Sequence, residues 1–287
     1  MDCTYGRGGR SSTRSAIKLA RAGVIAAMDE ALLARMRRVD PDRFFALLLA
    51  PAERRAALLA LTAFNHELAH AREAAREPTL ALIRLQWWRE VVEGTRPARH
   101  EVATPLLAAV TAGELARADL LAMIAAREIE ADPEIPDRSA WEGWLAGTGG
   151  GFAVAAGRAL GAPEALETRL RRLGAASALA GQLRNIPAHA RQGRCLLPAD
   201  ALAAHGLDAA TVMAHPDTPA LRPLLEALAG TGRAWLAEAG GALPRRLLAA
   251  VLPAVLARGD LRQPGAPRPR RLGARLAMLG AALLGRV

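Results

Sequence analysis

Apolar residues recur along the chain at the three- and four-residue spacing of amphipathic helices, and the alternation typical of strands is absent. The stretch TLALIRLQWWREVVEG predicts a helix that stops at Gly94. Before it, DPDRFFALLLAPAERRAALLALTAFNHELAHAREAAREP predicts a helix, a turn near Pro51 and a second helix closed by Pro78. Further helices are expected over 101–112, 115–130, 138–160, 163–190, 218–239 and 243–258. The pattern predicts a single all-α domain over residues 29–258.

The two ends of the chain differ from this helical body. Residues 1–28 carry five basic side chains and one acidic one, with several Gly and Ser, and predict a basic, flexible arm. Residues 259–271 are rich in Pro, Gly and Arg and predict a connector. Residues 272–287 predict a last apolar helix, too short and interrupted to span a bilayer. This helix either packs on the core or, with its basic connector, attaches to a membrane surface.

Composition and charge narrow the class of protein. Hydrophobic residues make up 52% of the chain and aromatic residues only 3%, which is typical of helical rather than β proteins. The net charge of +10 comes almost entirely from arginine, with Lys18 the only lysine. Such a charge favours anionic partners such as diphosphates or anionic lipids. The alternative cause of the high arginine content is a GC-rich genome, whose codons encode arginine more often than lysine. No basic patch is interleaved with aromatic residues, so nucleic acid is not an expected partner.

The cysteines and the N-terminal segment bear on the compartment. Cys3 and Cys195 are the only cysteines and offer no disulfide framework, which is typical of a reducing compartment. The apolar run AGVIAAM is too short for the core of a secretory signal. We therefore expect a cytoplasmic protein.

The stretch FNHELAH contains the His-Glu-x-x-His pattern of zinc proteases. His66 and His70 are four residues apart and share one face of a helix, so both imidazoles would reach one metal ion. Glu67 would then act as base on a bound water, and Glu90 would complete a three-ligand site. Neither a third histidine at the metzincin spacing nor a preceding strand is present, so zinc stays an alternative.

The run from Thr148 to Gly151 is rich in glycine and invites comparison with a phosphate-binding loop. It lacks both the Gly-Lys-Ser/Thr ending and the preceding strand of such a loop. The run therefore predicts close helix packing or a kink.

Five stretches together resemble the squalene/phytoene synthase family over residues 39–258. They are DPDRFFALLLAPAERRAALLALTAFNHELA, EPTLALIRLQWWREVV, WLAGTGGGFAVAAGRALG, ALAGQLRNI and GRCLLPADAL. The resemblance implies an all-helical isoprenoid-synthase bundle around a central cavity. In the active enzymes of this family, two Asp-rich motifs hold Mg²⁺ ions that bridge the substrate diphosphates, because Mg²⁺ takes oxygen ligands and neutralises the leaving group.

The chain departs from the family at both Asp-rich motifs. Where the first motif would stand it has Ala69, His70 and Glu73, so a single carboxylate remains. Where the second would stand it reads PAHARQGRCLLP, with no acidic residue and with Pro187 breaking the helix. We therefore expect no catalytic residues and no cofactor. The expected remnants of the cavity are Asn65, Ala69, His70, Glu73, Gln182, Asn185 and His189, with Arg184, Arg191 and Arg194 as candidates for binding an anion.

The closest resemblance is to the non-catalytic branch of the family that assists the assembly of respiratory complex I. It implies a pseudoenzyme at the inner membrane whose partners are subunits or assembly proteins of that complex, with an anionic or isoprenoid lipid as a further candidate ligand. The alternative is an active, Mg²⁺-dependent prenyl transferase of hopanoid or carotenoid biosynthesis.

Overall fold

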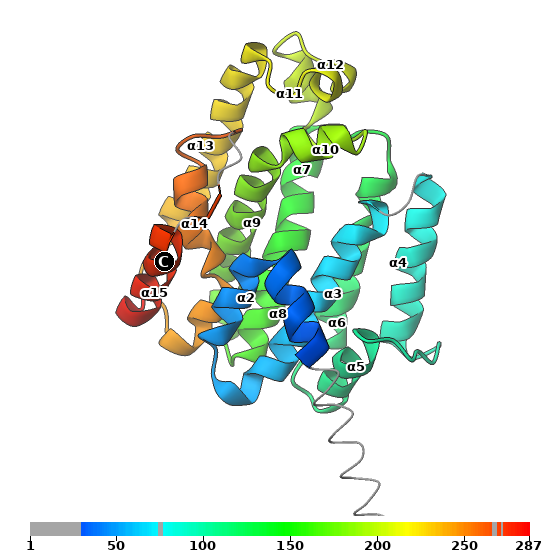
Figure 1. Ribbon diagram of the computed structural model, residues 1–287, viewed down its shortest axis with the longest axis vertical. Helices are drawn as coiled ribbons and strands as arrows, with labels where there is room; N and C mark the ends of the chain where they lie inside the picture. The colour runs from blue at the N-terminus through cyan, green and yellow to red at the C-terminus, as the bar shows by residue number, and fades with distance from the viewer. Residues whose placement is uncertain (1–29, 74–76, 266–268, 271) are drawn as a thin grey trace, which may run out of the picture.

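Helices carry the fold of the computed structural model, which describes residues 30–73, 77–265, 269–270 and 272–287 (Figure 1). The predicted arm over residues 1–28 lies outside the described part. Residues 30–39 are helical. The α-helices that follow are α2 (Pro41–Leu48), α3 (Arg55–Glu73), α4 (Pro78–Glu93), α5 (Ala103–Thr111), α6 (Arg117–Ala125), α7 (Arg138–Leu145), α8 (Gly151–Ala159), α9 (Glu167–Arg184), α10 (Ile186–Arg191), α11 (Ala199–Ala203), α12 (Ala209–Ala214), α13 (Arg222–Ala239), α14 (Pro253–Asp260) and α15 (Leu272–Leu284).

Short 3₁₀ and π segments join several of these helices. The 3₁₀ segments are η1 (Ala52–Arg54), η2 (Glu128–Ala131), η4 (Glu164–Leu166), η5 (Pro219–Leu221) and η6 (Arg245–Ala250), and η3 (Ala146–Gly150) is a π-helix. Within the described ranges, β structure is confined to two isolated bridges, Ile135 with Pro198 and Ala242 with Arg286. The predicted all-α class is confirmed.

Several helices end where the sequence predicts that they should. Gly94 ends α4 with a left-handed φ of 82°, and its amide donates to the Glu90 carbonyl at 3.1 Å. Pro187 lies in the first turn of α10, so α9 ends at Arg184 as the predicted break requires. The short helices α11 and α12 are missing from the prediction. Asp208, whose carboxylate accepts from the Thr211 amide at 2.7 Å, is the capping signal that marks α12.

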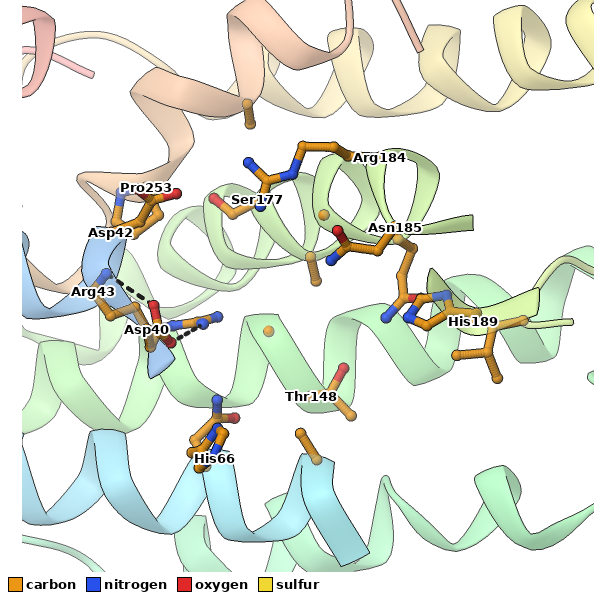
Figure 2. Close-up of a pocket in the computed structure, with 18 of the residues that line it drawn as sticks. Asp40, Asp42, Arg43, His66, Thr148, Ser177, Arg184, Asn185, His189 and Pro253 are labelled. Atoms are coloured by element: carbon orange, nitrogen blue, oxygen red, sulfur yellow. Dashed lines mark hydrogen bonds and ion pairs between the residues drawn. The ribbon is translucent and has the colours of Figure 1, made fainter. Parts of the chain in front are cut away.

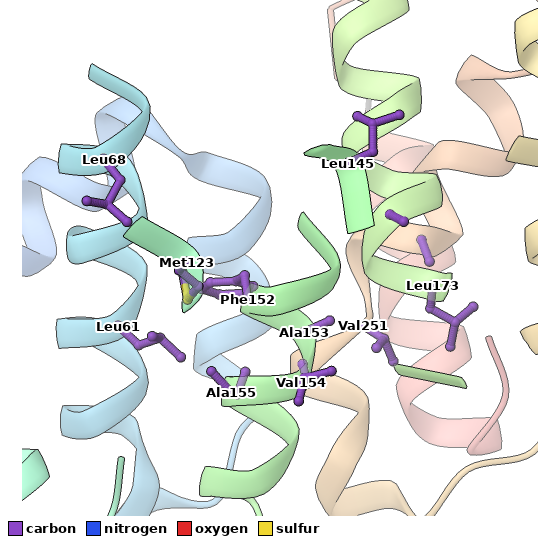
Figure 3. Packing of buried hydrophobic residues seen from close by; sticks show 14 of the residues in the cluster. Leu61, Leu68, Met123, Leu145, Phe152, Ala153, Val154, Ala155, Leu173 and Val251 are labelled. Atoms are coloured by element: carbon purple, nitrogen blue, oxygen red, sulfur yellow. The ribbon is translucent and has the colours of Figure 1, made fainter. Parts of the chain in front are cut away.

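Helix α9 occupies the middle of the bundle, where it contacts α8, α13, α14 and η3 (Figure 1). Buried Leu, Ala and Val side chains fill the space between the helices. Figure 3 shows Leu61 and Leu68 of α3 facing Phe152 of α8, with Leu173 of α9 on the far side. The low aromatic content is compatible with this core because closely spaced helices leave room mainly for small side chains.

The glycine run brings two backbones into contact, as the prediction of close packing requires. A Cβ at Gly149 would lie 2.7 Å from the carbonyl oxygen of Gly174, in the facing helix α9. A Cβ at Gly174 would lie 2.6 Å from the Ala153 Cβ and closer still to the Gly149 carbonyl. The π-helical turn η3 falls at this contact, so the run forms a close helix contact and an irregular turn.

We expect Gly174→Ala to lower the free energy of unfolding by about 3 kcal/mol, because the added methyl group has rigid backbone and an Ala side chain against it. Gly181→Ala is the matched control in the same helix: nothing lies within 4 Å of its Cβ. It should raise stability by about 0.5 to 1 kcal/mol. Urea denaturation followed by circular dichroism measures both. Equal stability of Gly174→Ala and the wild type would contradict the close-contact account.

Within the described ranges, no helix combines the length and the apolarity needed to cross a bilayer. The predicted last helix is present as α15, and Met278 is its buried contact with the bundle.

Candidate functional site

A cavity of about 300 Å³ lies between α2, α3, the η3 turn, α9 and α14 (Figure 2). Helix α3 contributes Asn65, His66 and Ala69, which recur at helical spacing on one face. Helix α9 and the residue after it contribute the opposite wall, formed by Ser177, Ala178, Gly181, Gln182, Arg184 and Asn185. Figure 2 shows His66 on one side of the cavity and Ser177, Arg184 and Asn185 on the other.

The structure brings most of the candidate cavity residues together. Asn65, Ala69, Gln182, Asn185 and His189 all line this cavity. The side-chain oxygen of Gln182 is buried and accepts no hydrogen bond within the described part of the chain. This oxygen is an acceptor that a donor group of a ligand in the cavity would satisfy.

Other candidates lie elsewhere. His70 does not line the central cavity; it lines a separate depression with Glu67, Arg84, Trp87, Trp88 and His100. Glu73 is the last residue of α3, and its side chain lies outside the described part of the chain. Among the anion-binding candidates, Arg184 and Arg194 line the cavity, whereas Arg191 is exposed and does not.

The expectation of a cavity nearly free of carboxylates is wrong. Asp40, Asp42, Glu130 and Asp260 all line it. They come from the start of α2, from α2 itself, from η2 and from the end of α14. Neither Asp-rich motif position supplies them, so inspection of those two positions alone misses them.

Arginine side chains pair with each of these carboxylates. Arg270 makes the most contacts: its Nε donates to Asp42 at 2.9 Å, and its two terminal nitrogens donate to Asp260 at 2.8 Å each. Arg184 adds a contact to Asp260 at 3.5 Å. Asp40 accepts from Arg43 at 2.8 Å (dashed in Figure 2). Guanidinium groups thus occupy the coordination space that a divalent cation would need.

Glu130 is the most deeply buried of the four, at 5% exposure. Its Oε1 accepts from Arg127 at 2.7 Å and from the Trp144 indole nitrogen at 2.9 Å. Its Oε2 accepts from Arg194 at 3.3 Å. One carboxylate therefore accepts hydrogen bonds from three side chains in three segments of the chain. No local sequence pattern predicts this cluster, because the partners lie up to 64 residues away.

Removal of the Glu130 carboxylate should destabilise the fold much more than removal of an exposed carboxylate. We expect Glu130→Ala to lower the free energy of unfolding by about 3 kcal/mol, because the partly buried Arg127 and the buried Arg194 lose their ion pairs with this carboxylate. Glu142→Ala, which breaks the exposed pair with Arg138, is the control and should cost less than about 0.5 kcal/mol. Chemical denaturation of both variants gives the comparison. A cost at Glu130 no larger than at Glu142 would contradict the account.

His66 is the titratable group of α3 at the cavity wall. Burial is the main cause that lowers the pKa of His66, and the nearby charges of Arg35 and His70 lower it further. Arg35 itself is held by Glu67 and Glu101. His66 is therefore an uncharged side chain at neutral pH.

This lowered pKa predicts a pH dependence of stability. The unfolded chain binds a proton at His66 with a pKa near 6.5, above the folded value. The His66 contribution is thus fully present above about pH 6.5 and is lost as the pH falls below that value. When the pH is lowered from neutral to below about 6.5, the free energy of unfolding should therefore fall less in His66→Gln than in the wild type. Denaturation midpoints across this range test it, and parallel curves for the two proteins would refute it.

The zinc alternative gains no support from the geometry. The His66 and His70 rings do share a face, with centroids 5.7 Å apart, but they line different depressions. Glu90 accepts hydrogen bonds from Gln86 at 3.2 Å and Arg96 at 3.0 Å, and these bonds lower its pKa. Over the described residues, no group of three or more His, Cys, Asp or Glu side chains is placed to hold a metal ion.

Comparison with known proteins places this helical cavity in a family. The sequence model described as squalene/phytoene synthase matches residues 36–271. The chain belongs to the squalene/phytoene synthase family. Among solved structures it is similar to a dehydrosqualene synthase in complex with ligand, with a TM-score of 0.72 at 15% identity, covering 91% of this chain and 97% of the other. It is also similar to squalene synthase HpnC from Alicyclobacillus acidocaldarius, with a TM-score of 0.62 at 17% identity, covering 91% and 95% of the two chains. These similarities establish the fold.

Sequence relatives carry a different kind of name. The chain is 28% identical over 184 residues to the Homo sapiens protein named NADH dehydrogenase (ubiquinone) complex I, assembly factor 6, which covers 62% of this chain and 55% of that protein. The Mus musculus protein of the same name is 29% identical over 177 residues, covering 60% and 53%. The chain thus aligns with about half the length of these relatives.

The donor set of this family member does not fit the Mg²⁺ ions that the family's synthases use. Mg²⁺ needs several oxygen ligands in near-octahedral geometry. The carboxylates at the cavity are bound instead by Arg43, Arg127, Arg184, Arg194 and Arg270. A cation entering this site would have to displace guanidinium groups that are already in place.

Proposed function

We propose that this member of the squalene/phytoene synthase family assists the assembly of respiratory complex I and does not condense isoprenoid diphosphates. The observation that carries the proposal is the pairing of the cavity carboxylates with arginine, above all the three hydrogen bonds from Arg270 to Asp42 and Asp260. The departing diphosphate needs its growing negative charge neutralised, and in the active enzymes of the family Mg²⁺ ions held by carboxylates do this. Carboxylates free to hold such ions are not supplied by the cavity as it stands.

The relatives support the assembly half of the proposal. The mammalian proteins that match 60% or more of this chain are named for the assembly of complex I. An assembly factor needs a stable binding surface rather than a metal site, and the arginine-paired cavity is compatible with that role. We propose the membrane that holds complex I as the place of action, with the cytoplasm as the compartment and subunits or assembly proteins of the complex as partners.

The cavity retains a binding role in this proposal. Arg184 and Arg194, which pair with Asp260 and Glu130, lie at its wall beside the amides of Gln182 and Asn185. A guanidinium has five N–H donors, so one that pairs with a carboxylate can also donate to a second acceptor. Basic and amide donors of this kind suit an anionic head group without a metal ion. An anionic or isoprenoid lipid is therefore the class of ligand that we propose for the cavity, and we propose no metal or organic cofactor.

The catalytic half predicts a negative result with a positive control. Purified protein with Mg²⁺ and farnesyl or geranylgeranyl diphosphate should form no condensed product above the level without protein. An active dehydrosqualene synthase assayed in parallel shows that the conditions support turnover. Condensation at a rate comparable with that control would overturn the pseudoenzyme proposal.

The assembly half is tested in cells that carry the gene. Its deletion should lower the amount of assembled complex I on native gels while leaving the other respiratory complexes unchanged, and re-expression of the chain should restore it. Unchanged complex I in the deletion strain would refute the assembly role. An accompanying loss of squalene, hopanoids or carotenoids would instead favour the prenyl transferase.

A further inference from the structure

The last helix, α15, presents its largest apolar side chains to solvent. All five of its leucines are exposed, by 37% at Leu279 and up to 76% at Leu284. The side chains that it turns toward the bundle are small or flexible: Met278 is buried, and Ala274, Ala281 and Ala282 pack partly against the core. The helix lies at the edge of the bundle and carries the C-terminus (Figure 1).

This arrangement reverses the usual order of an amphipathic surface helix. A helix that only closes a bundle turns its leucines inward and its polar residues outward. Here Leu272, Leu276, Leu279 and Leu283 form a continuous outward stripe at spacings of four, three and four residues. Contiguous exposed apolar surface of this kind marks a site of interaction.

The charge around the stripe indicates what lies against it. Residues 261–287 contain six arginines and no aspartate or glutamate. Arg275 and Arg286 are exposed at the two ends of the helix, and Arg245 and Arg258 are exposed on η6 and α14, the elements that contact α15. None of these four forms an ion pair within the described residues. The nearest acidic residue in sequence, Asp260, is already bound by Arg184 and Arg270.

We propose that the exposed face of α15 lies on the surface of an anionic lipid bilayer, with its leucines in the acyl boundary and the surrounding arginines on the head groups. This inference names the surface for the membrane location proposed above and rests on that part of it. Apolar burial and attraction of arginine to anionic lipid act together in such binding. A helical protein partner fits less well, because thirteen residues give fewer than two heptads and the helix offers no acidic side chain for paired charges.

Vesicle sedimentation with the purified full-length chain tests the proposal. Wild-type protein should bind vesicles of phosphatidylglycerol and phosphatidylcholine, and should bind phosphatidylcholine vesicles more weakly. Leu276→Gln with Leu283→Gln should weaken binding to the anionic vesicles by about tenfold or more, because two leucines lose their acyl contact. The matched control is Leu80→Gln with Ile83→Gln on α4, which are exposed to a similar degree on another helix and should leave binding unchanged.

The electrostatic part has its own variant. Arg275→Gln with Arg286→Gln should weaken binding to the anionic vesicles by about fivefold for each arginine, and should make binding less sensitive to salt. Its binding to phosphatidylcholine vesicles should stay the same. All these positions are exposed, so circular dichroism should show unchanged folding, and the comparison reports on the surface rather than on stability.

Three outcomes would overturn the proposal. The first is no binding of the wild type to anionic vesicles. The second is equal binding by the wild type and the α15 leucine variant. The third is a dimer by light scattering that the leucine variant dissociates, without vesicle binding, which would make the stripe a contact between copies of the chain. Complex I levels in the deletion strain report on the assembly role separately, so either proposal can fail while the other stands.

Discussion

The ion pairs between arginine and the carboxylates of the central cavity are the interaction on which the rest of this structure depends. Two of these pairs are local, Arg43 with Asp40 and Arg127 with Glu130. Others join elements that are distant in sequence: Arg270 reaches Asp42 across 228 residues, and Arg194 reaches Glu130 across 64. Through Arg270, these pairs tie α2 to the end of α14 at the cavity. Charges that would otherwise repel one another or attract a cation are satisfied within the chain itself.

This use of arginine also accounts for part of the unusual composition. The net charge of +10 suggests a protein that seeks anionic partners. Inside the bundle, however, the arginines at the cavity are matched by acidic residues, so they contribute little to the outer field. Around α15, by contrast, Arg245, Arg258, Arg275 and Arg286 are exposed, and the sequence from residue 261 onward contains no acidic residue. Cavity and surface thus have different electrostatic roles although both are rich in arginine.

Local sequence patterns predicted most of the helices and several of the points at which they end. The Gly94 stop, the break at Pro187 and the close packing of the glycine run are all encoded in a few adjacent residues, so sequence reasoning finds them. Helical spacing also puts Asn65 with Ala69, and Gln182 with Asn185, on shared faces, and the family resemblance implied that these faces look into a cavity, which they line. The short helices α11 and α12 were missed because five or six residues carry too little periodicity.

The content of the cavity could not be read in this way. Asp40, Asp42, Glu130 and Asp260 converge only through the tertiary fold, and no spacing rule relates η2 to α14. His70 lies outside the cavity although it is one residue from Ala69, because a helix turns adjacent side chains by about 100°. Arg191 is exposed at the end of α10, whereas Arg194, which follows the left-handed turn at Gly193, is buried. The motif positions therefore located the cavity wall but did not predict the four carboxylates that line the cavity.

The central claim is that guanidinium groups already occupy the carboxylates that a divalent cation would need. The most direct measurement is a titration of the purified protein with Mn²⁺, with and without inorganic pyrophosphate, followed by electron paramagnetic resonance of the free ion. The account predicts no saturable, stoichiometric binding at the cavity, and the appearance of binding when Arg270 is replaced by glutamine. Two or three tightly bound ions per wild-type chain in the presence of pyrophosphate would contradict it.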